Sequence, residues 1–336
     1  MPKTVAIVGV SGFSGAELAR LVSSDGELAL TGAYSDRMRG GTVAGGVIVR
    51  PQADADRAAE EAEIIALATP AEVSAELAPR LLAKGARVID LSGAFRLPDT
   101  SVFLEYYRFE HPEPALLAEA HYGLPQLPKT AGEAPAIEQA RIVANPGCYA
   151  TAAILALAPL ASAGALDGGP VFVDGKSGVT GAGRKLAERY LFTEVAENVS
   201  LYRVVDHQHV PEIELALRRV SGVDVRVTFA PHLLPIRRGL ITTCFGRLGP
   251  SVDPEAVEGA VRSAYAASSP FVRVVPIDTI DVHAVTHTPE AHVGVKVDRR
   301  GRSVVSACAL DNLMKGAASQ AWENIRRMCG LAARAA

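Results

Sequence analysis

Cysteine is scarce in this sequence, and its few copies are scattered. The four cysteines, Cys148, Cys244, Cys308 and Cys329, form no C-x-x-C pair and no cluster with histidine at metal-ligand spacing. This pattern excludes a disulfide framework and a structural zinc site. We therefore expect no metal cofactor, and a reducing, cytoplasmic location.

Long apolar runs and a strong charge imbalance are also missing. No stretch of 18 apolar residues occurs, and the opening MPKTVAIVGVSG has too few apolar residues before its glycines for a signal peptide. The formal net charge of -3 argues against a surface that coats nucleic acid. We expect a soluble protein that has neither a membrane nor a nucleic acid as partner.

Short apolar runs alternate with helical patterns in the first half of the chain. The runs, rich in β-branched residues and typical of buried parallel strands, cover 4–9, 28–35, 63–69, 86–92 and 141–145. This alternation predicts an α/β fold with a Rossmann doubly wound parallel sheet. We expect 99–140 to be an irregular excursion, with 111–127 on the surface.

The pattern changes after Cys148. Alternating apolar and polar residues predict strands of an antiparallel or mixed sheet at 224–230, 240–247, 293–297 and 303–310. The chain of 336 residues is thus expected to form two domains. The first covers 1–147 and is completed by a C-terminal helix over 311–336, and the second, of α+β type, covers 148–310.

A glycine-rich turn follows the first predicted strand. The stretch GVSGFSGAEL runs directly into a helical pattern, and Ser14 and Glu17 fit an S-x-x-E cap. Such a turn places a helix N-terminus where a dinucleotide pyrophosphate binds. We predict cofactor contacts at Gly9, Ser11, Gly12, Phe13, Ser14 and Gly15.

The end of the second strand bears on the choice of dinucleotide. The stretch AYSDRMRGG offers Ser35, Arg37 and Arg39, which suit a 2′-phosphate, together with Asp36, which suits a free ribose hydroxyl. We therefore predict NADP, while Asp36 leaves NAD open.

Cys148 lies between a Pro-Gly turn and a buried helical pattern in ANPGCYATAAILALAPL. A buried cysteine is ordinarily an inert hydrophobe. A thiol at a helix N-terminus, however, faces free N–H groups that favour a low-pKa thiolate. Beside a nicotinamide cofactor, a nucleophilic cysteine indicates acyl or aldehyde oxidoreduction through a thioester.

Two histidines are candidates for the accompanying acid and base. His207 and His209 occur in DHQHVPEIELAL, just before a predicted helix start. In an extended segment they point to opposite sides, so we expect only one to face the thiol.

Two stretches resemble anion-binding turns. Arg96 follows a predicted strand end in LSGAFRLPD, where ligands bind in parallel sheets. The glycine-rich DGKSGVTGAGRKL carries Lys176, Ser177 and Arg184 and could cradle a phosphate or a carboxylate. Either stretch could instead be a turn with solvated charge.

Several motifs in fixed order together resemble one family. In sequence order they are GVSGFSGAEL, LSGAFR, HYGLPQ, NPGCYATAA, SGVTGAGR, HQHVPEIE, FAPHLLPIRRGL and DNLMKGAASQA. The chain resembles the N-acetyl-γ-glutamyl-phosphate reductases of arginine biosynthesis, in the semialdehyde dehydrogenase superfamily. It departs from their pattern at Gln208, where arginine is expected between the histidines, and at Val210.

The resemblance implies an enzyme that reduces N-acetyl-L-glutamyl 5-phosphate to the 5-semialdehyde with NADPH, through a thioester on Cys148. It implies a homodimer or homotetramer with a catalytic and oligomerisation domain over 148–310, and slightly favours His207 over His209. It places Asn312 near the nicotinamide. It implies substrate contacts at Arg96, Asn145, Ser177, Gly178, Arg184 and Glu212, without fixing which arginine holds phosphate and which carboxylate.

Three other functions remain open at this stage. An aspartate-semialdehyde dehydrogenase and a reductase of a carrier-linked aminoadipyl phosphate would use the same chemistry. The carrier-linked enzyme would need a basic face, which the sequence does not show. An NADP-binding redox sensor could use Cys148 as a switch, but it would need neither the histidines nor the anion-binding stretches.

Overall fold

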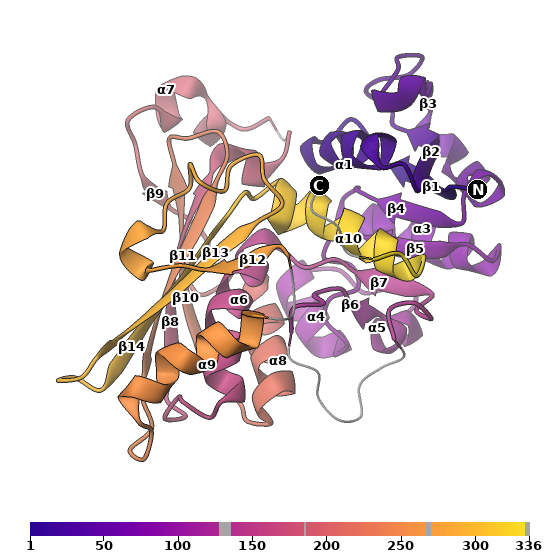
Figure 1. The fold of residues 1–336 in the computed structure, drawn as a ribbon. Helices are drawn as coiled ribbons and strands as arrows, with labels where there is room; N and C mark the ends of the chain where they lie inside the picture. Colours follow the sequence, from indigo (N-terminus) through magenta and orange to yellow (C-terminus); the bar gives the residue numbers. More distant parts are fainter. Residues whose placement is uncertain (128–135, 185, 267–269, 333–336) are drawn as a thin grey trace.

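The computed structural model describes residues 1–336 except 128–135, 185, 267–269 and 333–336. It contains two seven-stranded sheets, which lie side by side (Figure 1). One sheet is parallel and the other is mixed, so the predicted fold class is confirmed.

The parallel sheet is built from the first half of the chain. Its strand order is β3-β2-β1-β4-β5-β7-β6, and every pair of neighbours is parallel. The predicted strands are all present. The first is shifted by one residue and the other four are shorter than predicted, while β3 and β6 were missed because two residues carry no pattern. The strands are β1 Lys3–Val8, β2 Leu28–Tyr34, β3 Val49–Arg50, β4 Ile64–Leu67, β5 Arg87–Asp90, β6 His121–Tyr122 and β7 Ile142–Ala144.

Helices cover both faces of this sheet. Helices α1 and α10 share a core with one face, and α2 to α5 pack on the other. Their bounds are α1 Phe13–Ser24, α2 Ala58–Glu61, α3 Ala71–Ala83, α4 Thr100–Tyr107, α5 Ala115–Glu119 and α10 Ser319–Met328, with short 3-10 turns at Ala44–Gly46 and Gln52–Arg57.

The expectation of an irregular surface segment over 99–140 was wrong. Helices α4 and α5 and strand β6 lie within it, and both Phe103 and Leu117 are buried. Asp99 caps α4, since its Oδ1 accepts the N–H groups of Ser101 at 2.8 Å and Val102 at 3.1 Å. Helices of 8 and 5 residues are too short to show a clear period in the sequence. Residues 128–135 lie outside the described part of the chain.

The mixed sheet follows Cys148, with strand order β12-β13-β14-β11-β8-β10-β9. Strands β11 and β14 coincide with their predicted ranges, whereas β8 was wrongly taken for a glycine-rich turn. Gly175 is a strand residue because the Tyr149 ring packs against it, and a Cβ there would lie 2.6 Å from Cε1 of Tyr149. The strands are β8 Val171–Gly178, β9 Ser200–Leu201, β10 Val227–Leu234, β11 Leu240–Arg247, β12 Val272–Val274, β13 Ala291–Asp298 and β14 Ser303–Leu310.

One helix forms the core of this half. Helix α6 is apolar on all sides, and it packs against α8, β11 and β14. The helices are α6 Cys148–Ser162, α7 Phe192–Val195, α8 His209–Ser221 and α9 Pro254–Ala266, with 3-10 turns at Val179–Ala182, Glu188–Tyr190 and Ile277–Thr279. Among the described residues no helix combines the length and apolar character that crossing a membrane requires.

The chain finally returns to the parallel sheet. A π-helix, Met314–Ala318, leads into α10, which lies beside α1 (yellow in Figure 1). Trp322 Nε1 donates to Asp25 Oδ2 at 2.8 Å, and Arg326 donates to the same oxygen at 2.6 Å. The helix ends at Met328, earlier than predicted, because Gly330 takes the left-handed conformation that terminates helices, with φ of +69°.

Candidate active site

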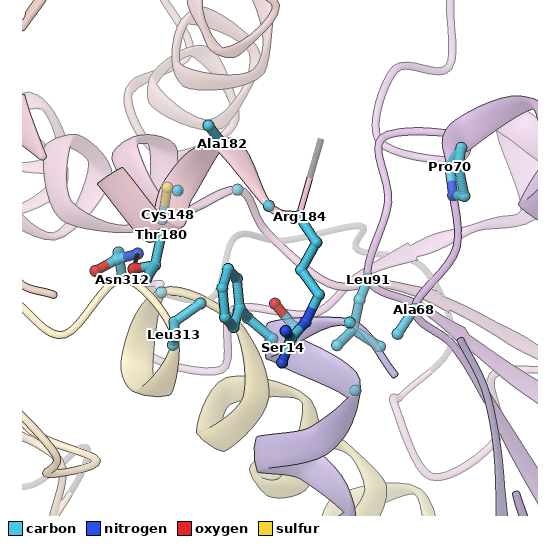
Figure 2. A pocket seen from close by; sticks show the side chains of 18 of the residues that line it. Ser14, Ala68, Pro70, Leu91, Cys148, Thr180, Ala182, Arg184, Asn312 and Leu313 are labelled. Carbon is cyan, nitrogen blue, oxygen red and sulfur yellow. Dashed lines mark hydrogen bonds between the residues drawn. The ribbon is translucent and has the colours of Figure 1, made fainter. Parts of the chain in front are cut away.

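A cavity of about 920 Å³ lies where the two sheets meet. Its wall combines the glycine turn after β1, the ends of β2, β4 and β5, the start of α6, and the segment from β8 to the 3-10 turn Val179–Ala182. Further lining comes from stretches within 189–209 and 312–317. The cavity thus brings the predicted cofactor turn and the predicted nucleophile into one space (Figure 2).

The glycine turn is shaped to receive a dinucleotide. Gly9 has a φ of +90°, and a Cβ there would lie 2.3 Å from the carbonyl oxygen of Ala68. A Cβ on Gly15 would lie 2.4 Å from the Gly9 oxygen, so α1 packs directly on the turn. Helix α1 starts at Phe13 after Gly12, and no side chain caps it. The N–H groups at its start therefore remain available for a phosphate.

The predicted cap of α1 by Ser14 and Glu17 was wrong. The helix begins one residue before Ser14, and the Glu17 carboxylate points instead toward the second half of the chain. Its Oε1 accepts Nη1 of Arg238 at 2.7 Å, and Arg238 also pairs with Asp311 at 3.0 Å. This buried arginine therefore ties α1 to the strand end that precedes Asn312.

The end of β2 forms the other end of the cofactor site. The hydroxyls of Ser11 and Ser35 are 2.5 Å apart, and Ser35 Oγ accepts the Arg37 N–H at 3.3 Å. Ser35 and Arg37 line the cavity. Arg39 lies outside the lining, where it donates to Asp36 at 2.7 Å, and this bond lowers the pKa of Asp36.

Cys148 is the first residue of α6, with Gly147 as the N-cap. The π-helix presses on it, because a Cβ on Gly316 would lie 2.7 Å from Cβ of Cys148. Burial raises the pKa of the Cys148 thiol to about 11, against the smaller effects of the Tyr149 N–H and the Arg96 charge. The expected low-pKa thiolate is therefore wrong, because desolvation outweighs the helix N-terminus.

The two histidines lie together in the cavity wall. Their ring centres are 4.6 Å apart, and Nδ1 of His207 accepts the backbone N–H of His209 at 3.2 Å. The His209 ring lies against the turn before the cysteine, since a Cβ on Gly147 would be 2.1 Å from its Nε2. Burial lowers the pKa of His207 to about 3 and that of His209 well below its ordinary value. Both rings are thus neutral without ligand.

Glu212 and Arg96 support the turn before Cys148. Oε1 of Glu212 accepts the Gly147 N–H at 2.9 Å and the Tyr122 hydroxyl at 2.8 Å. Arg96 donates to the carbonyl oxygens of Asn145 at 2.8 Å and Leu91 at 3.0 Å, and lies 3.5 Å from Oε2 of Glu212. Burial works against the Arg96 charge, but Glu212 holds the pKa of Arg96 above its usual range.

Two predicted substrate contacts lie behind the cavity rather than in its lining. Glu212 is buried with the partners described above. Asn145 uses its side chain to hold the C-terminal segment, donating to the Ala317 carbonyl at 3.2 Å and accepting from Asn324 at 3.0 Å. Both residues hold other parts of the protein in place.

The other predicted contacts do line the cavity. Ser177 and Gly178 end β8, and Asn312 accepts the Gly239 N–H at 2.9 Å and donates to Thr180 at 3.0 Å. The Arg184 guanidinium lies 4.2 Å from the Phe13 ring centre, and Figure 2 shows it reaching toward the start of α1. Arg184 therefore lies against the start of α1, next to the glycine turn. Lys176 lies outside the lining and pairs with Asp174.

Sequence reasoning missed a group of polar side chains beside the histidines. Arg189, Tyr190 and Arg203 line the cavity, as does Tyr202. They come from a stretch of short turns without periodicity, so no sequence pattern predicts that they line the cavity. The one available signal was the density of arginine and tyrosine just before the histidine pair.

No group of three or more histidine, cysteine, aspartate or glutamate residues in the described ranges could hold a metal ion. The site therefore consists of one thiol, two imidazoles, several guanidinium groups and a glycine turn.

Alkylation of Cys148 by iodoacetamide is expected to accelerate about tenfold per pH unit from pH 6 to 9, because the thiolate fraction rises in that proportion below the pKa. Peptide mass spectrometry of the native, ligand-free protein measures the rate. Cys244 and Cys308, 1% and 0% exposed, serve as internal controls that should stay unmodified. A rate for Cys148 that levels off below pH 8 would contradict the raised pKa.

Comparison with known proteins identifies the class. The NAD binding domain model of semialdehyde dehydrogenases matches residues 4–133, and their dimerisation domain model matches residues 148–312. Aspartate semialdehyde dehydrogenase II from Vibrio cholerae superposes with a TM-score of 0.74 at 17% identity, covering 98% of this chain and 99% of that one. The chain is therefore a member of the semialdehyde dehydrogenases and has their fold.

Curated relatives narrow the class further. N-acetyl-gamma-glutamyl-phosphate reductase from Pelotomaculum thermopropionicum is 38% identical over 340 residues, covering 98% of this chain and 96% of the relative. The enzyme of the same name from Brevibacillus brevis is 39% identical and covers 97% and 95%. The chain belongs to the N-acetyl-gamma-glutamyl-phosphate reductase family.

Proposed function

We propose that the protein reduces N-acetyl-L-glutamyl 5-phosphate to N-acetyl-L-glutamate 5-semialdehyde with NADPH and releases phosphate. The observation that carries this proposal is the position of Cys148, at a helix N-terminus in the same cavity as the glycine turn. The names of the relatives support the choice of substrate.

The residues of the turn fit a nicotinamide dinucleotide, since a side chain at Gly9 or Gly15 would collide with the backbone there. When bound, the cofactor supplies the hydride that reduces the acyl group. Arg37 and Ser35 line the cavity and favour the 2′-phosphate of NADP, while Arg39 neutralises Asp36, the group that would bind an NAD ribose. A structural neighbour, aspartate semialdehyde dehydrogenase from Candida albicans, is described with NADP. Asn312, which Thr180 and Gly239 hold in the lining, is proposed to lie near the nicotinamide.

The reaction begins with a neutral thiol and neutral imidazoles. The Cys148 sulfur attacks the acyl carbon, the thiol proton passes to a histidine, and phosphate departs as the thioester forms. After reduction of the thioester, the histidine gives its proton to the hemithioacetal oxygen. It then takes that proton back as the C–S bond breaks, which releases the aldehyde, and passes it to the Cys148 sulfur to restore the thiol. The N–H groups at the start of α6 stabilise the oxyanion.

We assign the proton transfer to His209. Although the family resemblance slightly favoured His207, the His209 ring lies directly against Gly147, beside Cys148, with Nε2 4.0 Å from Oε2 of Glu212. His207 lies among aromatic rings, 5.9 Å from Tyr149 and 5.2 Å from Phe229, and orients its neighbour through the Nδ1 hydrogen bond.

The leaving phosphate is assigned to Arg96, Ser177 and Gly178. A guanidinium has five N–H groups, and three of those of Arg96 donate to partners within the protein. These hydrogen bonds fix the plane of the group and leave two N–H groups for an anion. Arg184 approaches the phosphates of the cofactor from its place on Phe13. Glu212 and Asn145 act on the substrate indirectly, by holding the turn before Cys148.

Assembly and location complete the proposal. We propose that residues 1–147 with 311–336 bind the dinucleotide, and that residues 148–310 carry the nucleophile and the subunit contact of a homodimer or homotetramer. On the outer face of the mixed sheet, exposed Phe172 and Phe245 are paired on adjacent strands, which supports such a contact. Four free cysteines fit a cytoplasmic enzyme. A purely monomeric species in analytical ultracentrifugation would contradict the assembly.

The purified protein is expected to reduce NADP⁺ with N-acetylglutamate 5-semialdehyde only when phosphate or arsenate is present, because the thioester needs an anion to accept the acyl group. Absorbance at 340 nm measures this reverse reaction. NAD⁺ should be roughly ten- to a hundredfold less efficient, as expected for loss of one charge-assisted contact. Aspartate semialdehyde serves as the competing substrate and should react poorly.

Activity undiminished without either anion would remove acyl-phosphate chemistry from the proposal. Equal efficiency with NAD⁺ would show that the arginine does not select the cofactor. A preference for aspartate semialdehyde would indicate that the protein acts as an aspartate-semialdehyde dehydrogenase.

A further inference from the structure

Two arginines beside the histidines have no role in the mechanism described above. Arg189 and Arg203 both line the cavity. Within the described ranges neither forms an ion pair, whereas Arg96 lies on Glu212 and Arg184 on the Phe13 ring. Among the described residues, Arg189 and Arg203 therefore bring to the cavity two positive charges that no acidic side chain pairs with, in addition to those of Arg37 and Arg184.

The protein holds Arg203 in an unfavourable backbone conformation. Its φ is +45°, and Val205, a β-branched residue, has a φ of +60°. Hydrogen bonds to β10 fix the segment, since Tyr202 N–H donates to the Pro231 oxygen at 3.2 Å and Val205 N–H to the Phe229 oxygen at 3.0 Å. A strained backbone that the surrounding structure holds in place is typical of residues in functional sites.

The side chains are oriented as well as charged. Arg203 donates to the Asp206 carbonyl at 2.8 Å and to the side chain of Gln208, which lies between the two histidines in the sequence. The Arg189 guanidinium lies 5.8 Å from the Tyr202 ring centre and 5.6 Å from that of Tyr190. Arg189 lies against aromatic rings, and Arg203 donates to two oxygens of its own segment. Both arrangements orient the guanidinium and leave N–H groups that can bind a planar anion.

We infer that Arg189 and Arg203 form a clamp for the α-carboxylate of the substrate, and so determine its specificity. The inference rests on the proposed function, in which the reacting acyl group lies at Cys148 and the phosphate on Arg96. The carboxylate and the acyl carbon of a glutamyl chain are four bonds apart, about 5 Å when extended. Both arginines line the same cavity as Cys148 and the two histidines, so the carboxylate and the acyl group of one substrate can each meet their partners within it.

The clamp also affects the neighbouring imidazole. Burial is the main cause of the low pKa of His207, and the positive charge of Arg203 is the second. The same charge also lowers the pKa of His209. A carboxylate bound to Arg203 cancels this charge and makes the imidazoles easier to protonate. Binding of the correct substrate thereby prepares the histidine to accept the thiol proton.

The test compares N-acetylglutamate 5-semialdehyde with its α-carboxamide analogue, using the whole enzyme with NADP⁺ and phosphate. The unmodified enzyme should prefer the acid by roughly ten- to a hundredfold in kcat/KM. Arg203→Gln and Arg189→Gln should each lose most of that preference, through a higher KM for the acid and an unchanged KM for the amide. Arg203→Lys, which keeps the charge, should recover part of it, and Arg262→Gln on α9 should behave as the unmodified enzyme.

Variants that fold and still prefer the acid as strongly would overturn the clamp. Absence of phosphate-dependent turnover in the unmodified enzyme would instead refute the proposed function. Calorimetric binding of N-acetyl-L-glutamate and its α-amide to the same proteins decides the clamp in that case: equal binding of the acid by the unmodified and Arg203→Gln proteins would overturn it. Circular dichroism melting verifies that each variant is folded.

Discussion

Replacing Cys148 with alanine is expected to lower kcat by on the order of 10⁴ to 10⁶, since the variant has no atom that can form the thioester. Affinity for NADPH should remain unchanged, because the glycine turn and Ser35 do not contact this side chain. Stopped-flow turnover and fluorescence titration of NADPH measure the two effects. Cys329→Ala is the matched control, since Cys329 is also free but packs at the end of α10, away from the cavity.

A Cys148→Ala variant that retained even a tenth of normal turnover would show that the acyl group is transferred without a covalent step. A variant that lost NADPH binding as well would instead indicate collapse of the cavity. The start of α6 is well supported by Glu212 and Gly316, so we expect the first effect without the second.

Replacing His209 with asparagine is expected to lower kcat by about 10² to 10⁴, the usual contribution of a positioned acid and base. His207→Asn should have a smaller effect, because it disturbs only the orientation of His209. In the unmodified enzyme, the low pKa of His209 keeps its ring neutral well into the acid range. The fall of kcat/KM on the acid side should therefore lie well below the usual pKa of a histidine, and the asparagine variant should lose that dependence.

Exposed His283 offers the control, as His283→Asn should leave rate and pH profile intact. If His207→Asn were the more damaging variant, the proton-transfer role would move to His207. If neither variant changed the pH profile, the proton would have to pass through another group.

The sequence allowed the parallel sheet to be predicted because its strands are buried on both faces and therefore form continuous apolar runs. It did not reveal β8, whose Gly175 and charged neighbours resemble a turn until the Tyr149 ring is placed against them. Strands of two residues, such as β3 and β6, contain too little pattern to recognise.

The site was predictable where a local pattern carries the chemistry, as in the glycine turn and the cysteine at the start of α6. The thiol pKa was mispredicted, because burial depends on what the π-helix and α8 place over Cys148. Arg203 escaped notice because the hydrogen bonds of its neighbours Tyr202 and Val205 to β10 bring it to the cavity, and Arg189 because it lies in a short 3-10 turn without periodicity. Glu212 was recognised as part of the site, but the sequence could not show that its partner is a backbone N–H.

The position of α10 affects how the protein is made. The core on one face of the parallel sheet joins Val5, Ile7 and Leu18 to Trp322 and Ile325, residues from opposite ends of the chain. A ribosome adds roughly 5 to 20 residues per second, so the first strand waits some tens of seconds for its covering helix. During that interval the apolar face of the nascent sheet is exposed to chaperones. The N-terminal half therefore completes its folding only after α10 has been synthesised.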